Sequence, residues 1–182
     1  MTTEFILAEA LKKMMALQPL EQITVKALVE KCDITRPTFY YHFHDIYDLL
    51  AWIFLNEKIE GIDKAASWQE AILKIGRYCV TNRSLVRQTH ESAGRDLLIE
   101  FLNNNLYAFH LRAIETIDVQ KRIDIDDRKR LALFYSAALN AVLLDWIRSN
   151  MKEPLLAITE RLSPLVGNYL EPLIKEQIYE NV

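Results

Sequence analysis

Hydrophobic residues recur at helical spacing along most of the chain. Val25, Leu28, Val29 and Cys32 follow one another at i, i+3, i+4 and i+7, which is typical of a helix with one apolar stripe. Only four glycines and five prolines interrupt the 182 residues, and half of the residues are hydrophobic. The pattern predicts an all-α chain with enough apolar side chains for a substantial core.

The periodic segments predict the order of the helices. Outside residues 24–44, helices are expected over residues 3–17, 45–59, 68–81, 84–89, 96–119, 128–150 and 154–179. In the first of them, Phe5, Ala8, Leu11 and Met15 should face inward. We divide the chain into an N-terminal three-helix domain, residues 1–48, and a C-terminal helical bundle, residues 49–182.

Residues 24–44 combine helix caps with a tight turn. Thr24 should cap one short helix and Thr35 the next, because their hydroxyls can accept from the free amides of a first turn. Asp33 stands where the first helix must stop and tolerates the left-handed conformation. Pro37 falls in the first turn of the second helix, where its missing N–H costs nothing. Two short helices joined in this way predict a helix-turn-helix, whose second helix can enter the DNA major groove.

The second short helix has one apolar and one polar face. Phe39 and Phe43 are four residues apart and should face the core. The outward side chains are expected to be Arg36, Thr38, Tyr40, Tyr41 and His42. These groups can donate to phosphates or reach base edges, although each tyrosine could instead pack on a neighbouring helix.

The sequence TVKALVEKCDITRPTFYYHFHDIYDLL, residues 24–50, resembles the DNA-binding segment of the TetR family of bacterial transcriptional regulators. The shared features are a capped helix, a turn, and a short helix that ends in Tyr-x-His-Phe. The candidate DNA-binding residues are Thr24, Lys26, Thr35, Arg36, Pro37, Thr38, Tyr40, Tyr41 and His42. We assign Arg36, Thr38 and Tyr41 to bases, and Tyr40 and His42 to phosphates.

Two positions depart from the family pattern. Asp33 stands where the family usually has glycine, and Ile46 replaces a lysine that often contacts phosphate. The formal net charge is −3, whereas many DNA-binding domains are strongly basic. We therefore expect modest affinity for each half-site and dependence on a dimer.

A second distinctive segment, residues 134–162, is unusually apolar. Two copies of such helices can form a four-helix bundle around a two-fold axis. The candidate homodimer interface is Leu139, Val142, Leu143, Trp146, Leu162, Leu165 and Tyr169. The alternative is a core helix of a monomer. This segment resembles a TetR subgroup that includes activator-like proteins of dihydroxyacetone kinase operons.

The family resemblance also implies an effector pocket in the C-terminal bundle. The candidates are Trp68, Tyr78, His90, Phe101, Asn105, Tyr107, His110 and Tyr135. The alternatives are that these residues are plain core, or that the effector is a protein partner and no small-molecule pocket exists.

Catalytic motifs are missing from the sequence. No Glu-x-x-His pair, His-Glu-x-x-His, Gly-x-Ser-x-Gly or phosphate loop occurs, so we expect no enzyme, cofactor or metal. Two separated cysteines and the absence of a signal peptide indicate the cytoplasm. The apolar run 131–147 contains Ser136, Asn140 and Asp145 and falls short of a membrane span.

The expected function is sequence-specific regulation of transcription by a dimer on a pseudo-palindromic, double-stranded operator. An effector-controlled repressor is the first hypothesis. The alternatives are an activator, or an adaptor that is controlled by a protein partner and has lost DNA binding.

Overall fold

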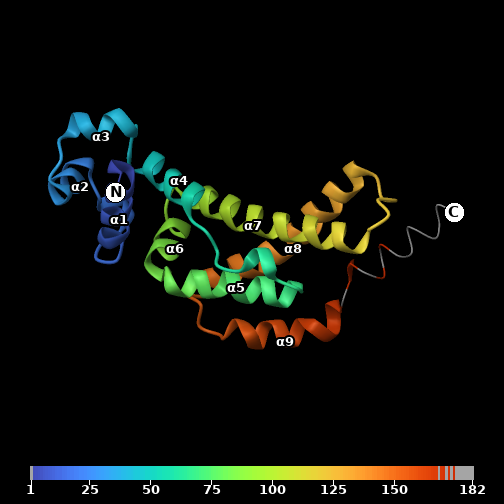
Figure 1. Ribbon diagram of the computed structural model, residues 1–182. Helices are drawn as coiled ribbons and strands as arrows, with labels where there is room; N and C mark the ends of the chain where they lie inside the picture. The colour runs from blue at the N-terminus through green and yellow to red at the C-terminus, as the bar shows by residue number, and fades with distance from the viewer. Residues whose placement is uncertain (1, 168, 171, 173, 175–182) are drawn as a thin grey trace. The chain divides into compact units, whose positions relative to one another are not determined.

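The computed structural model describes residues 2–167, 169, 170, 172 and 174, and all regular structure among them is helical (Figure 1). The all-α fold class is therefore confirmed. The α-helices are α1 (Thr3–Met15), α2 (Val25–Cys32), α3 (Arg36–His42), α4 (Ile46–Asn56), α5 (Trp68–Thr81), α6 (Arg83–His90), α7 (Arg95–Ile117), α8 (Ile125–Arg148) and α9 (Leu155–Val166). Two short 3-10 helices, η1 (Leu20–Gln22) and η2 (Ile62–Lys64), were not predicted.

Two compact units make up the chain. Unit 1 consists of Met1–Lys58 and Thr81–Phe101, and unit 2 consists of Ile59–Val80 and Leu102–Val182. Packing thus divides the chain differently from the predicted functional boundary after residue 48, and that functional boundary stays a prediction.

Unit 1 is built around α1, which packs on α2, α4 and α6, while α3 packs on α2. Ala8, Leu11 and Met15 of α1 are buried, as predicted, and Leu7, which was not predicted to face inward, is also fully buried. Phe5 was expected to face inward with them, but its side chain is 44% exposed. The prediction was wrong because Leu7 and Ala8 fill the inward positions of this turn, two and three residues further along the helix.

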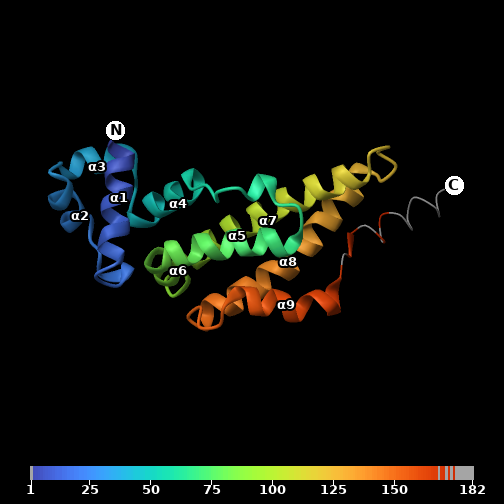
Figure 2. The ribbon, with the colours of Figure 1, turned by 60° about the horizontal axis from the view of Figure 1, so that its bottom comes forward.

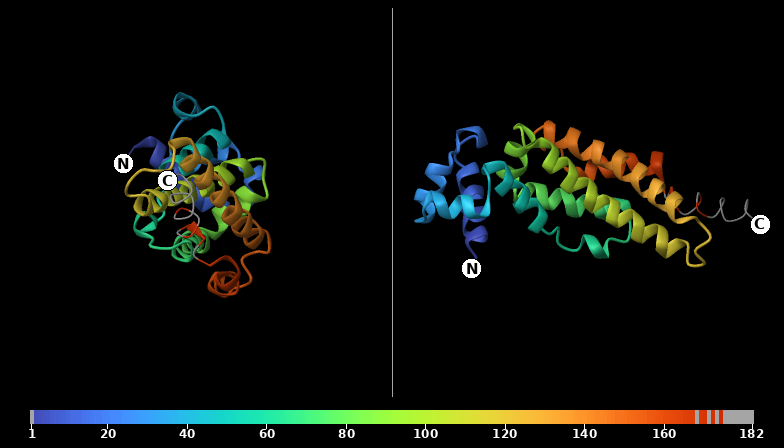
Figure 3. Two further views of the ribbon diagram at one scale, coloured as in Figure 1. Left: turned by 90° about the vertical axis from the view of Figure 1, so that its right-hand side faces the viewer. Right: turned by 90° about the horizontal axis from the view of Figure 1, so that it is seen from above.

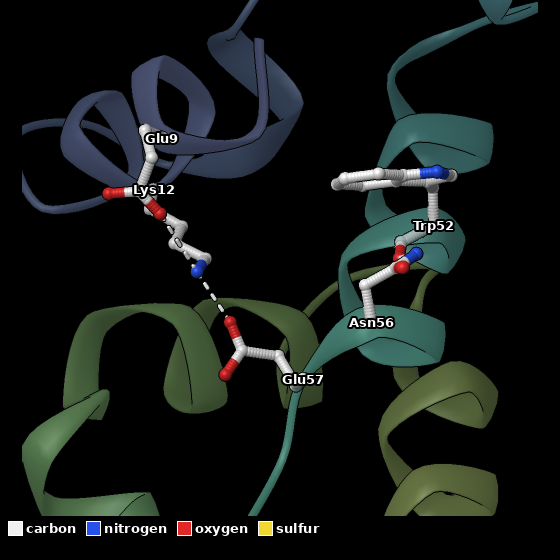
Figure 4. A network of polar contacts seen from close by, with 5 residues as sticks. All are labelled: Glu9, Lys12, Trp52, Asn56 and Glu57. Carbon is white, nitrogen blue, oxygen red and sulfur yellow. Dashed lines mark hydrogen bonds and ion pairs between the residues drawn. The ribbon is translucent and has the colours of Figure 1, made fainter. Parts of the chain in front are cut away.

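Lys12 links α1 to the end of α4. Its ammonium group donates to Glu9 at 3.1 Å and also to Glu57, which follows the last residue of α4 (Figure 4). Burial alone would lower the pKa of Lys12, but the hydrogen bonds to both carboxylates outweigh burial and raise it. The side-chain amide of Asn56, the last residue of α4, donates to the carbonyl oxygen of Trp52 one turn earlier, at 2.8 Å.

In unit 2, α7 and α8 run side by side in opposite directions (Figure 3). Ile114 of α7 and Ala132 of α8 are buried in one apolar cluster with Ile123, Leu170 and Ile174. The turn between the helices is held by the buried Asp118 carboxylate. It accepts from the backbone amides of Arg122 and Ile123 and pairs with Arg128 at 2.9 Å.

Gly76 lets α5 and α9 approach closely (Figure 2), because a Cβ at this position would overlap Cδ2 of Leu155. We expect Gly76→Ala to lower the free energy of unfolding by about 1–2 kcal/mol, since overpacking outweighs the higher helix propensity of alanine. In a Leu155→Ala background the same change should instead be neutral or stabilising, by up to about 1 kcal/mol. Urea unfolding of the four proteins in this cycle measures both values. Destabilisation of equal size in both backgrounds would contradict a role in close packing.

The last predicted helix is shorter than expected. Residues 154–179 were predicted as one helix, but α9 ends at Val166 and Gly167 follows with φ 63° and ψ −155°. This conformation is almost restricted to glycine, and it interrupts the helical path. The end of the predicted helix, Tyr179, lies outside the described residues.

By length and hydropathy, α8 alone among the helices of the described ranges could cross a membrane. Its most apolar window has a mean hydropathy of 1.3, and 39% of that window is buried in this chain. The run 131–147, which the sequence predicted to fall short of a span, lies within this helix. A core helix meets the same criteria, and the polar side chains of Ser136 and Asn140 are buried within unit 2.

Candidate nucleic-acid interface

The predicted caps and turn of the helix-turn-helix are confirmed. Thr24 accepts from the amide of Ala27 at 3.2 Å and Thr35 from that of Thr38 at 3.3 Å. Asp33 ends α2 in the left-handed conformation, with φ 53° and ψ 44°. Asp45 caps α4 by accepting from the amide of Asp48 at 2.9 Å. Each end of the recognition segment is thus fixed by its own neighbouring residues.

The faces of α3 also follow the prediction. Phe39 and Phe43 are buried in unit 1 with ring centroids 5.9 Å apart. On the opposite side, Tyr40 is 56% and Tyr41 is 85% exposed. The guanidinium group of the exposed Arg36 makes no hydrogen bond or ion pair with the described parts of the chain. A short helix therefore presents a guanidinium and two phenol groups to solvent.

Two of the candidates on α3 already have partners. The hydroxyl of Thr38 lies 2.8 Å from that of Thr35, so part of its hydrogen-bonding capacity is used inside the cap. His42 is half-buried, and its Nδ1 lies 2.9 Å from Oε1 of Glu4 on α1. No pattern in the sequence pointed to Glu4, because 37 residues lie between it and His42 and no local spacing relates the two.

The remaining candidates lie on the surface beside α3. Thr24 and Lys26 are exposed at the start of α2, and Pro37 is exposed in the first turn of α3. Lys26 is 4.0 Å from Glu30, but both side chains are largely exposed, so solvent screens this pair strongly. Ile46, the position of the missing lysine, is buried in unit 1. Its side chain packs in the core and is not available for a phosphate contact.

The candidate dimer residues occupy different environments. Leu139, Leu143 and Trp146 are buried by the chain itself, Val142, Leu162 and Tyr169 are half-buried, and Leu165 is exposed. The three buried residues therefore have little surface left for a partner, and the interface stays a prediction. The exposed face of α8 instead carries Phe134, Ala137, Ala138 and Ala141.

The candidate effector residues are divided between the two units. His90 and Phe101 belong to unit 1, and the other six belong to unit 2. Unit 2 contains a cavity of about 720 Å³, and Trp68 is the only one of the eight that lines it. The other lining residues include Lys64, Phe109, Arg112 and Ile117, none of which the sequence had singled out.

His110 and Tyr135, two further effector candidates, belong to a buried polar cluster. His110 Nδ1 lies 2.9 Å from the Leu106 carbonyl oxygen, and Nε2 lies 2.8 Å from the Tyr169 hydroxyl. A carbonyl can only accept, so Nδ1 carries the proton and Nε2 accepts from Tyr169. Ser136 lies 3.2 Å from Nδ1, and the rings of Tyr135 and Tyr169 stack at 4.1 Å.

Two family profiles match the sequence. Residues 6–53 match the family described as "Bacterial regulatory proteins, tetR family", and residues 66–168 match the "Transcriptional regulator C-terminal region". The second match covers more than half of the chain. A helix-turn-helix joined to such a region defines a DNA-binding regulator of transcription. The chain belongs to the TetR family of bacterial transcriptional regulators.

Known proteins of the same kind are similar in sequence and structure. The HTH-type dhaKLM operon transcriptional activator DhaS of Lactococcus lactis subsp. lactis (strain IL1403) is 34% identical over 84 residues. That match spans 44% of this chain and 45% of the relative. A solved structure of the dihydroxyacetone kinase operon activator DhaS has a TM-score of 0.63 at 25% identity, with 95% of this chain and 96% of that chain covered.

A second solved structure shares the fold. The fatty acid degradation regulator FadR from Bacillus halodurans has a TM-score of 0.58 at 14% identity, with 91% of this chain and 95% of that chain covered. At this identity the likeness shows the fold alone.

Proposed function

We propose that this regulator binds a pseudo-palindromic operator in the cytoplasm as a homodimer, with one α3 in the major groove of each half-site. The observation that carries the proposal is the exposed polar face of α3, between a Thr35 cap and a buried Phe43. Arg36 and Tyr41 are proposed to reach base edges, and Tyr40 and His42 to contact phosphates. The half-sites should be about 34–36 Å apart, one turn of DNA.

An apolar surface supports the dimer. Phe134 on α8 is 68% exposed, and Ala137 and Ala141 follow it at helical spacing on the same exposed face. On α9, Leu156 and Leu165 are also exposed. A monomer that left these side chains in water would be unusual, because contiguous apolar patches mark interfaces. Small residues along α8 would also let a second copy of the helix approach closely.

The sign of regulation is proposed from the relatives. Repression was the first hypothesis from the sequence, but a curated relative and a solved structure are both described as operon activators. We therefore favour activation, with effector-controlled repression as the alternative. The cavity in unit 2, beside Trp68 and Arg112, is a candidate site for a small effector, and a protein partner is the other possible effector. Regulators of this family act by binding, so no catalytic role is proposed.

The test is selection of binders from a random duplex library by the purified full chain at moderate salt, repeated with Tyr40→Ala and with His42→Ala. A recovered palindrome that both variants bind more weakly, with a shallower salt dependence, is the expected result, since each variant loses a phosphate contact. Sedimentation measures the mass of the free protein and of the complex. A folded protein that enriches no sequence would contradict operator binding, and the adaptor hypothesis would then replace it.

A further inference from the structure

Only one ring nitrogen of His42, Nδ1, has a partner among the residues that the structure describes. Its Nδ1 lies 2.9 Å from Oε1 of Glu4, in the first turn of α1. Nε2 has no hydrogen-bond partner among the residues that the structure describes, and the side chain keeps 20% of its surface exposed. One ring nitrogen is therefore engaged with a carboxylate, and the other is left for an external acceptor.

The chemistry of the pair depends on protonation. An imidazole that has a carboxylate at Nδ1 carries its proton there, so the neutral ring presents Nε2 as an acceptor. A phosphate oxygen is also an acceptor, and it repels a bare nitrogen lone pair. Only the doubly protonated ring can donate to Glu4 and to a phosphate at the same time. Contact with DNA through Nε2 therefore requires the charged form of His42.

Glu4 supplies a charged partner for the ring. Hydrogen bonds from its own backbone amide and from the Thr2 side chain, followed by the charge of His42, lower the pKa of the Glu4 carboxyl. Glu4 is therefore negatively charged at neutral pH. A carboxylate that orients a histidine through one nitrogen while the other nitrogen binds a charged group is a recurrent arrangement at metal sites, and the same logic applies to an anion when the ring is doubly protonated.

We propose that Glu4 is a positioning residue for DNA binding: it orients His42 through Nδ1, so that Nε2–H donates to a backbone phosphate and operator binding takes up a proton at this contact. This inference rests on the proposed contact between His42 and phosphate. Operator affinity should therefore fall as the pH rises, because the contact needs the doubly protonated ring.

Other groups near the ring do not replace Glu4 in this role. Tyr41, on the same helix, meets the imidazole edge-on with ring centroids 5.0 Å apart, and Phe43 is apolar. The carboxylates at the start of α4 are occupied with the backbone, since Asp45 accepts from the amide of Asp48, and Asp48 accepts from that of His44. In the described part of unit 1, Glu4 is the charged side chain that contacts His42.

The test compares wild type, Glu4→Gln and His42→Gln on the selected operator at about pH 6 and about pH 8, at fixed salt. Wild type should bind about tenfold or more tightly at the lower pH, since two half-sites each gain a charge-assisted hydrogen bond. Glu4→Gln keeps an acceptor for Nδ1–H but loses the charge. It should bind about three- to tenfold more weakly than wild type near pH 7 and recover part of that loss at pH 6. His42→Gln should bind with little dependence on pH.

Glu21→Gln is the matched control, because Glu21 is an exposed acidic residue of unit 1 in the 3-10 helix η1. Removing its charge reduces repulsion from DNA, so binding should be unchanged or tighter at both pH values. Calorimetry in two buffers of different ionisation enthalpy counts the protons taken up, a readout that a merely structural role of Glu4 would not change.

The outcomes separate the two proposals. If wild type binds the operator but Glu4→Gln behaves like Glu21→Gln, with unchanged proton uptake, then Glu4 only supports the start of α1 and this inference is overturned. If wild type binds no duplex at either pH, the proposed function itself fails.

Discussion

Replacing Tyr41 with alanine should nearly abolish operator recognition and leave folding intact. The Tyr41 side chain is 85% exposed, and its described ring contact is the edge of His42, so its loss should change the free energy of unfolding by less than about 0.5 kcal/mol. A lost base contact weakens binding by about 1–3 kcal/mol, or about 2–6 kcal/mol over two half-sites. The operator Kd, measured by fluorescence anisotropy, should therefore rise about thirtyfold or more.

Leu55→Ala is the control for this prediction. Leu55 is equally exposed, at 83%, but it lies on α4. This variant removes a similar apolar area from solvent, and operator affinity should not change. If Tyr41→Ala binds the operator as tightly as Leu55→Ala does, base recognition must lie on other side chains of α3, with Arg36 as the first to examine.

Acidification should destabilise unit 2 through His110. Its imidazole is fully buried, and burial lowers its pKa to about 4 from an ordinary value of 6.5, although the hydrogen bond to Leu106 acts in the opposite direction. Between these two values the unfolded chain binds a proton that the folded chain does not, so the free energy of unfolding falls as the pH falls. The stability is fully present above pH 6.5 and is lost as the pH approaches about 4. The loss amounts to about 3 kcal/mol, from the size of the pKa difference.

Urea unfolding at about pH 7 and about pH 4.5, at one protein concentration, measures this effect. In His110→Gln the part of the pH dependence due to this site should disappear, although the variant is less stable at pH 7 because it loses the hydrogen bond from Tyr169. His44→Gln replaces an exposed histidine and should keep the wild-type pH profile. The same pH slope in wild type and His110→Gln would show that other groups cause the acid destabilisation.

The parts of the fold that the sequence predicted well depend on local interactions. The caps at Thr24 and Thr35 and the left-handed turn at Asp33 depend on residues close to one another in the sequence. The residue types at neighbouring positions are therefore enough to predict these caps and this turn. The inward Phe39 and outward Tyr41 follow from the helical period within a single helix. The boundaries of α5, α6 and α7 were likewise placed to within two residues.

The features that were missed depend on contacts between distant residues. Phe5 is apolar and lies on a helix, but whether its side chain is buried depends on which face of α1 packs on α2 and α4. The contact between Glu4 and His42 joins two helices, and no local spacing indicates it. Leu143 and Phe134 on α8 are both hydrophobic, so their residue types alone could not show that Leu143 is buried in unit 2 and Phe134 is exposed. The shortened α9 depends on the conformation of Gly167, which composition alone does not specify.

One helix, α7, belongs to both compact units: residues 95–101 lie in unit 1 and residues 102–117 in unit 2. The residues just before this helix also contact the N-terminal part of unit 1: Gly94 leaves room for the side chain of Leu50, and Gln88 of α6 donates to the Met15 carbonyl oxygen. A recombination event that exchanged only the N-terminal segment would separate these partners. Operator preference in this lineage should therefore evolve by point substitutions on α3, and a chimeric regulator would need two junctions, with residues 81–101 transferred together with the DNA-binding segment.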